Sequence, residues 1–183
     1  MNNMFGFIDK IDKFKKTDQS SSKSDQPPQN INEKIEKREL LDLNQKEIWI
    51  IDDDKNIVDA CLRLWEFESK GSDYQFNHFD KAKDAIEELK RRIENKEKLP
   101  GTILVDGYLD LDDEELNSGP LVVNQIKKLA NGIKIIGFSS SEAKNEEMME
   151  AGAETAFRKT EAKLVGDYLK KQAEQSKELE NQK

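Results

Sequence analysis

Short apolar runs that stop at polar or charged residues recur along most of this chain, and helical apolar spacing separates them. The first run covers residues 48–51 and is followed directly by three aspartates. A run that is hydrophobic at every position is typical of a strand buried on both faces of a parallel sheet. The alternation therefore predicts an α/β fold, a doubly wound five-stranded parallel sheet with helices on both faces.

The same spacing predicts the individual elements. We expect strands at 48–51, 74–79, 102–105, 133–138 and 155–158, and helices at 56–67, 82–93, 121–129, 143–151 and 161–180. Pro100 and Gly101 are expected to end the second helix before the third strand begins. Gly152 is expected to cap the short fourth helix, because glycine readily adopts the left-handed conformation of a helix end.

Charge and composition exclude several classes of protein. The net charge of −8 argues against a nucleic-acid partner and against general attraction to anionic membranes. No apolar run approaches the roughly 20 residues of a membrane-spanning helix, and the N-terminus lacks a secretory signal, so we expect a cytoplasmic protein. With Cys61 and His78 as the only residues of their types, disulfide frameworks and Cys- or His-based metal clusters are excluded. The chemistry must rest on Asp, Ser and Lys.

The N-terminal part differs in composition from the rest. We expect a short amphipathic segment at 1–16, a disordered, charged linker at 17–46, a domain at 47–175 and a charged end at 176–183. Acidic and basic residues balance within residues 1–45, so the whole net charge lies in the predicted domain. Segment 1–16 is interpreted as a docking helix for a partner or a membrane surface, or as a terminal helix that frays or packs on its own domain.

Acidic, hydroxyl and basic residues follow four of the predicted strands. Asp52, Asp53 and Asp54 follow the first strand, and the third, fourth and fifth are followed by Asp106, Ser139 and Lys159. Ligands of such sheets bind beyond the carboxyl ends of the strands. Carboxylates gathered there repel one another, and Mg²⁺ with its preference for oxygen ligands would relieve the repulsion. A lysine and a hydroxyl beside them suit a phosphoryl group.

These motifs resemble the receiver domain of bacterial two-component response regulators. The resemblance covers roughly residues 46–175 and rests on IWIIDDD (48–54), TILVD (102–106), IIGFSSS (135–141) and GAETAFRK (152–159). It implies a flavodoxin-like sheet of order 2-1-3-4-5 and a stand-alone, chemotaxis-regulator-like protein. It also implies a Mg²⁺ site and a phosphoacceptor aspartate.

Carried over residue by residue, the resemblance assigns a role to each strand-end residue. Asp106 would be the phosphoacceptor and a metal ligand, and Lys159 would pair with the phosphoryl charge. The remaining metal contacts and the phosphoryl hydroxyl would come from Asp53 directly, Asp52 through water, the backbone carbonyl of Tyr108, and Ser139. Asp54 would instead face the start of the first helix.

The implied function is a single-domain response regulator and not an enzyme. It would accept a phosphoryl group from a sensor histidine kinase or a phosphotransfer protein, in a Mg²⁺-dependent reaction, and signal by binding a downstream protein. One alternative is a degenerate receiver that acts as a phosphorylation-independent adaptor. A minor alternative is a Mg²⁺-dependent phosphatase, for which Asp52 and Asp54 supply a D-x-D pattern but no late acidic pair follows.

The chain departs from the family pattern at the output side. Thr160 stands where the family usually has proline after the lysine, and Ala156 stands where an aromatic switch residue is usual. Phe157 is expected to point into the core, so the switch surface at Ser140, Ala156 and Phe157 would lack the usual hydroxyl-to-aromatic coupling or replace it. The acidic loop at 110–115 is interpreted as a solvated insertion, with partner screening or a second cation as alternatives.

Overall fold

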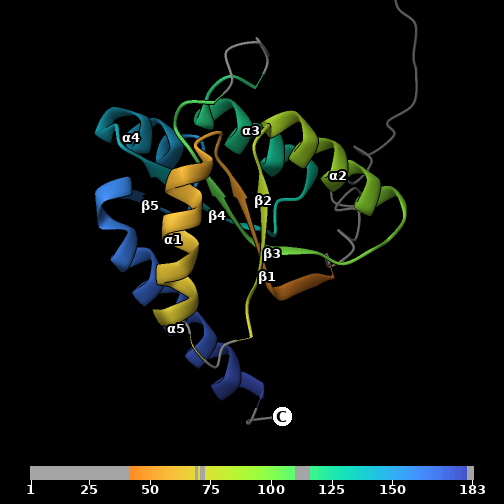
Figure 1. Cartoon of the computed structure of the whole chain (residues 1–183). Helices are drawn as coiled ribbons and strands as arrows, with labels where there is room; N and C mark the ends of the chain where they lie inside the picture. The colour runs from red at the N-terminus through yellow and green to blue at the C-terminus, as the bar shows by residue number, and fades with distance from the viewer. Residues whose placement is uncertain (1–41, 69, 71–72, 110–115, 181–183) are drawn as a thin grey trace, which may run out of the picture. The chain divides into compact units, whose positions relative to one another are not determined.

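The computed structural model describes residues 42–68, 70, 73–109 and 116–180. In this part of the chain five parallel strands form one sheet in the order β2-β1-β3-β4-β5 (Figure 1). The elements in chain order are β1 (Leu43–Ile51), α1 (Lys55–Glu68), β2 (Gln75–Phe79), α2 (Ala82–Glu94), β3 (Leu99–Val105), α3 (Gly119–Leu129), β4 (Lys134–Ser139), α4 (Glu142–Glu150), β5 (Thr155–Arg158), the 3₁₀ helix η2 (Lys159–Glu161) and α5 (Ala162–Glu180). The predicted fold class and strand order are confirmed.

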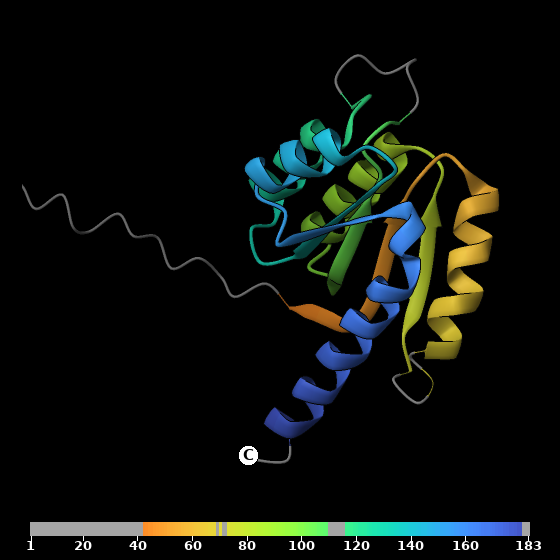
Figure 2. The same cartoon turned by 90° about the vertical axis from the view of Figure 1, so that its left-hand side faces the viewer.

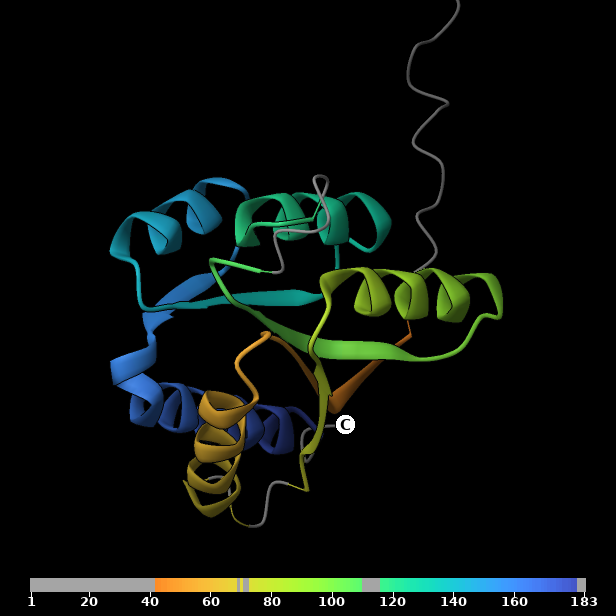
Figure 3. The same ribbon diagram turned by 45° about the horizontal axis from the view of Figure 1, so that its top comes forward.

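Helices cover both faces of the sheet. Figure 3 shows α1 and α5 on one side, and α2, α3 and α4 on the other. Each side has its own apolar core: one includes Trp65 and Phe138, and the other includes Trp49, Leu89 and Ile126. Helix α5 continues past the sheet toward the C-terminus (Figure 2). Burial on both faces explains why the central strands read as unbroken apolar runs.

Strand β1 begins earlier than the apolar run predicts. Its first residues, Leu43 and Asn44, pair with Leu99 and Pro100 of β3, and the register shifts between Asn44 and Ile48. The prediction that Pro100 and Gly101 precede the strand was therefore wrong, because both lie inside β3. Gly101 is needed at this crossing, since a Cβ there would lie 2.7 Å from the Cα of Gln45.

The structure shows what caps two of the predicted helix ends, the start of α1 and the end of α4. Asp54 Oδ1 accepts hydrogen bonds from the backbone N–H groups of Asn56 (3.1 Å) and Ile57 (3.2 Å), which caps the start of α1 as expected. Gly152 follows α4 with φ of +108°, a conformation that favours glycine. The first of these ends lies at the carboxyl edge of the sheet, after β1, and the second at the amino edge, before β5.

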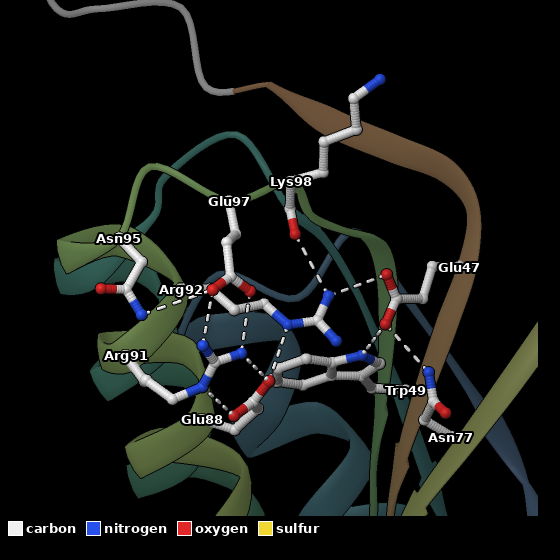
Figure 4. Close-up of polar contacts among 9 residues, drawn as sticks. All are labelled: Glu47, Trp49, Asn77, Glu88, Arg91, Arg92, Asn95, Glu97 and Lys98. Atoms are coloured by element: carbon white, nitrogen blue, oxygen red, sulfur yellow. Dashed lines mark hydrogen bonds and ion pairs between the residues drawn. The ribbon is translucent and has the colours of Figure 1, made fainter.

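A polar network closes the opposite, amino edge (Figure 4). Glu47 is buried in β1 and accepts hydrogen bonds from Trp49 Nε1 (2.8 Å), Asn77 Nδ2 (2.9 Å) and Arg92 Nη1 (2.9 Å). The guanidinium of Arg92 also lies over the Trp49 ring, 5.0 Å from its centroid, and bonds Glu88. Every strong acceptor of Glu47 is thus paired, and the network ties α2 to β1 and β2.

Several predicted features lie outside the described residues. These are the amphipathic segment 1–16, most of the linker 17–46 and the acidic loop 110–115. Their predicted roles remain predictions. Among the helices of the described part, none has the length and apolar character to cross a membrane.

Candidate functional site

The carboxyl edge of the sheet brings two buried carboxylates and one lysine together. Asp52 directly follows β1, Asp106 directly follows β3, and both are largely shielded from solvent, with 1% and 6% of their surface exposed. Lys159, the first residue after β5, lies between them. Its Nζ is 2.8 Å from Asp52 Oδ2 and 3.0 Å from Asp106 Oδ2. One ammonium therefore serves two carboxylates.

A third acid, the exposed Asp53, completes a set of oxygen donors. Asp52, Asp53 and Asp106 each offer a carboxylate oxygen, and these atoms lie within 4.8 Å of one another. Asp52 Oδ2 is buried and forms an ion pair with Lys159 Nζ, the same ammonium that contacts Asp106. One positive charge shared between two buried carboxylates leaves net negative charge at the site, which is costly in a buried position. The donor set and this excess negative charge fit a hard divalent cation.

Electrostatics at the site favour the arrival of positive charge. Burial is the main cause that raises the pKa of Asp106, and the charge of Asp52 raises it further. The pKa of Asp52 is also raised, chiefly by burial, although Lys159 opposes the shift. Burial lowers the pKa of Lys159, but its two carboxylate partners outweigh burial and the pKa is raised. The ammonium therefore stays charged, while the carboxylates are held at a free-energy cost.

The backbone of Asp52 is fixed on both sides by the end of β2. Its N–H donates to the Phe79 carbonyl at 3.1 Å, and its own carbonyl lies 2.7 Å from His78 Nε2. Its side-chain Oδ1 accepts a hydrogen bond from the Asp54 N–H at 3.0 Å. The His78 contact was not predicted from the sequence. Its one signal was a polar residue next to the end of the second predicted strand.

Ser139 lies beside Asp106, as the strand-end argument predicted. It ends β4, is 1% exposed, and its Oγ accepts a hydrogen bond from the Ser141 N–H at 3.3 Å. A Cβ on Gly107 would lie 2.4 Å from that Oγ, so the missing side chain at Gly107 is what lets the hydroxyl approach the residue after Asp106. The structure thus brings all the predicted strand-end residues to one edge.

The other predicted site residues are more peripheral. The Tyr108 side chain is 57% exposed, and Lys144 Nζ lies 5.6 Å from its ring centroid. Ser140 is exposed and Ala156 is half-buried. Phe157 packs against the core on the α1/α5 side and contacts Tyr168 of α5, with 5.9 Å between ring centroids, which agrees with the expectation that it points inward.

Solved structures share this architecture. The DrrB receiver domain, in a BeF₃-activated form, is 20% identical over 71% of this chain and 98% of that one, with a TM-score of 0.51. This chain has the receiver-domain fold. The receiver resemblance predicted from the motifs is confirmed at the level of the fold.

Further receiver-fold neighbours are response regulators. The manganese-bound form of Rcp1 is 21% identical, covers 68% of this chain and 89% of that one, and gives a TM-score of 0.51. RcsB of Salmonella typhimurium is 14% identical over 66% of this chain, with a TM-score of 0.53, and the chain spans only 55% of RcsB. No protein-family model matches the sequence, and the search of curated proteins finds no significant match.

Proposed function

We propose that this receiver-fold chain is a phosphoacceptor signalling domain and that Asp106 takes the phosphoryl group. The observation that supports the proposal most directly is the shared contact of Lys159 with the buried carboxylates of Asp52 and Asp106, at the carboxyl ends of adjacent strands. Such a concentration of buried negative charge is unfavourable for folding alone. It is useful where a phosphoryl group and a cation must be bound.

In the proposed reaction an Asp106 carboxylate oxygen attacks the phosphorus of a phosphohistidine. A new O–P bond forms as the P–N bond to the histidine ring breaks, and the electron pair stays on the ring nitrogen. Lys159 would pair with the charge of the transferred oxygens, and the Ser139 hydroxyl would hydrogen bond one of them. The product is an aspartyl phosphate, a reactive acyl phosphate that water can hydrolyse.

Asp52, Asp53 and Asp106 are the residues that would hold a divalent cation, with Mg²⁺ as the proposed ion and the Tyr108 carbonyl as a further donor. When bound, the cation would neutralise charge on the transferred oxygens. The manganese-bound form of Rcp1, a receiver-fold neighbour, is consistent with a divalent site in this fold. Three hydrogen bonds, two of the Asp52 backbone and one of its side chain, fix the position of Asp52, which supports this role.

The proposed partners are a sensor histidine kinase or phosphotransfer protein as donor, and a downstream protein as target. The adaptor alternative needs no phosphorylation, so it gives no role to the two buried carboxylates that share Lys159. The phosphatase alternative needs a nucleophile on the first strand. Asp52 and Asp54 would supply the D-x-D pattern of such an enzyme, but the sequence after Lys159 supplies no pair of aspartates.

The test is covalent labelling. Acetyl phosphate with Mg²⁺ is expected to add one phosphoryl mass to the wild-type chain, and Asp106→Asn is expected to abolish the addition. Asp167→Asn, which removes an exposed acid paired with Lys163, serves as the matched control and should label normally. Peptide mapping after borohydride reduction should locate the product at Asp106.

Each alternative gives a different outcome. Labelling that persists in Asp106→Asn refutes the assignment of the phosphoacceptor. An unlabelled wild type that still recovers a partner equally with and without Mg²⁺ supports the adaptor. Sustained turnover of a small phosphate monoester supports the phosphatase.

A further inference from the structure

Helix α4 carries one buried polar side chain that the proposed chemistry does not use. Asn145 is 8% exposed, and with Met148 it makes up the whole buried face of this short helix. An amide at such a position must find its hydrogen bonds inside the protein. The partners it has found are informative, because they belong to two different strands.

The amide of Asn145 joins the ends of β4 and β5. Its Nδ2 donates to the Ser139 carbonyl at 3.3 Å and to the Phe157 carbonyl at 3.0 Å. Ser139 is the residue proposed to bind the phosphoryl group, and Phe157 lies in the strand that leads to Lys159 and α5. A displacement of the Ser139 backbone therefore has to lengthen one of these bonds or carry Asn145 with it.

The other end of the same amide is unsatisfied. Asn145 Oδ1 is buried and has no hydrogen-bond partner within the described ranges. Leaving a buried acceptor without a donor costs free energy. A shift that brings a donor to Oδ1 would therefore be favourable.

Small neighbours make room for this amide. A Cβ on Gly137 would lie 3.0 Å from the Ala156 Cβ and 3.5 Å from Asn145 Oδ1, so β4, β5 and Asn145 meet at van der Waals distance. Ala156 is the position at which the sequence departs from the aromatic of the receiver pattern. The small residue there leaves α4 close enough to the two strands for Asn145 to span them.

The contacts continue from β5 into α5. The Phe157 ring packs edge-on against Tyr168, and the Tyr168 hydroxyl donates to Glu154 Oε1 at 2.8 Å. An unbroken series of contacts thus runs from the carboxyl edge of the sheet to α5, through Ser139, Asn145, Phe157 and Tyr168. Each link is a hydrogen bond or a ring contact.

We propose that Asn145 is a positioning residue that transmits movement of Ser139 to β5 and α5, in place of an aromatic at position 156. The inference rests on the proposed function, since the movement begins when Ser139 bonds the phosphoryl group. Asn145 touches no reacting atom. Its role is to hold two strand ends to one helix, so that they move together.

The test compares Asn145→Leu with wild type by amide NMR before and after acetyl phosphate and Mg²⁺. Leucine keeps the buried volume and the helix but has no donor. In wild type we expect shift changes at residues 139–141 and at 156–168. In Asn145→Leu the changes at 139–141 should persist, whereas those at 156–168 should fall at least threefold, with the extent of Asp106 labelling unchanged.

Two further variants keep the test decisive. Asn145→Ala serves if Asn145→Leu does not fold, and Glu146→Gln, an exposed neighbour on α4, should behave as wild type. Equal propagation to 156–168 without the Asn145 amide overturns the proposal while leaving the phosphoacceptor function intact. Failure of wild-type labelling overturns the phosphoacceptor function, and the role of Asn145 with it.

Discussion

Replacing Asp106 with asparagine should stabilise the protein in the absence of divalent cations. The substitution keeps the shape of the side chain and removes one of two buried negative charges that share Lys159. The pKa of Asp106 is raised in the folded state, which means that the ionised form is the less favourable one there. Removing the ionisable group should therefore favour the folded state at neutral pH.

The magnitude follows from three contributions. At an effective dielectric constant of about 20, charges on Asp52 and Asp106 no more than 4.8 Å apart repel by at least about 3.5 kcal/mol. Lys159 at 3.0 Å attracts Asp106 by about 5.5 kcal/mol. Burying the carboxylate costs several kcal/mol, which exceeds the difference of about 2 kcal/mol. The expected gain in the free energy of unfolding is about 1–3 kcal/mol.

The assay is urea or thermal unfolding at pH 7 in EDTA. A gain of this size should raise the melting temperature by about 4 °C for each kcal/mol. Asp167→Asn removes an exposed acid and should change stability by less than about 0.5 kcal/mol. An Asp106→Asn variant that is no more stable than wild type would show that burial and repulsion do not outweigh the lysine contact.

The pH dependence gives an independent check on the sign. A carboxyl whose pKa is raised by folding binds its proton more tightly in the native state, so its favourable contribution is complete below the ordinary value of 3.8. That contribution is lost as the pH rises through the folded pKa. The stability gap between Asp106→Asn and wild type should therefore narrow on acidification. A gap that stays constant down to pH 3 contradicts the electrostatic explanation.

Two other substitutions probe the two edges of the sheet. Gly107→Ala places a Cβ 2.4 Å from Ser139 Oγ, so we expect a loss of about 1–3 kcal/mol in unfolding free energy and labelling by acetyl phosphate slowed about tenfold. Labelling at the wild-type rate would contradict the close approach. Glu47→Gln weakens the bond to Arg92 and should cost about 2 kcal/mol, measured by urea unfolding. Burial raises the Glu47 pKa, but the hydrogen bonds that Glu47 accepts, led by that from Arg92, lower the pKa overall. The stability that ionised Glu47 contributes should therefore be lost as the pH falls through its folded pKa. A stability loss in Glu47→Gln that does not depend on pH would contradict this explanation.

Much of the fold and of the site could be predicted from the sequence because both depend on strand periodicity. The apolar run at 48–51 predicts a buried strand, and the polar residues that follow such strands must meet at the carboxyl edge of the sheet. For this reason the sequence predicts the shared edge at which the structure has Asp52, Asp106, Ser139 and Lys159. The residue types at the strand ends are what indicate a site there.

The rest depends on contacts between distant segments. The first residues of β1 are polar at Asn44 and Gln45, and they join the sheet only because Gly101 lets the strands cross. His78 and Asn145 bond backbone carbonyls, which leave no trace in sequence periodicity. The strand and helix patterns reveal what is buried, but not which main-chain groups a buried polar side chain will meet.

The fully paired network around Glu47 and the carboxylate of Asp52, which shares one lysine with Asp106, lie at opposite ends of the same strand. At its amino end β1 is held by Arg92, Asn77 and a change of register over Gly101. A strand anchored in this way has no freedom to slide and so separate the carboxylates at its far end. Relief has to come from a ligand that enters the site, and the rigidity of one edge thereby makes the other edge responsive.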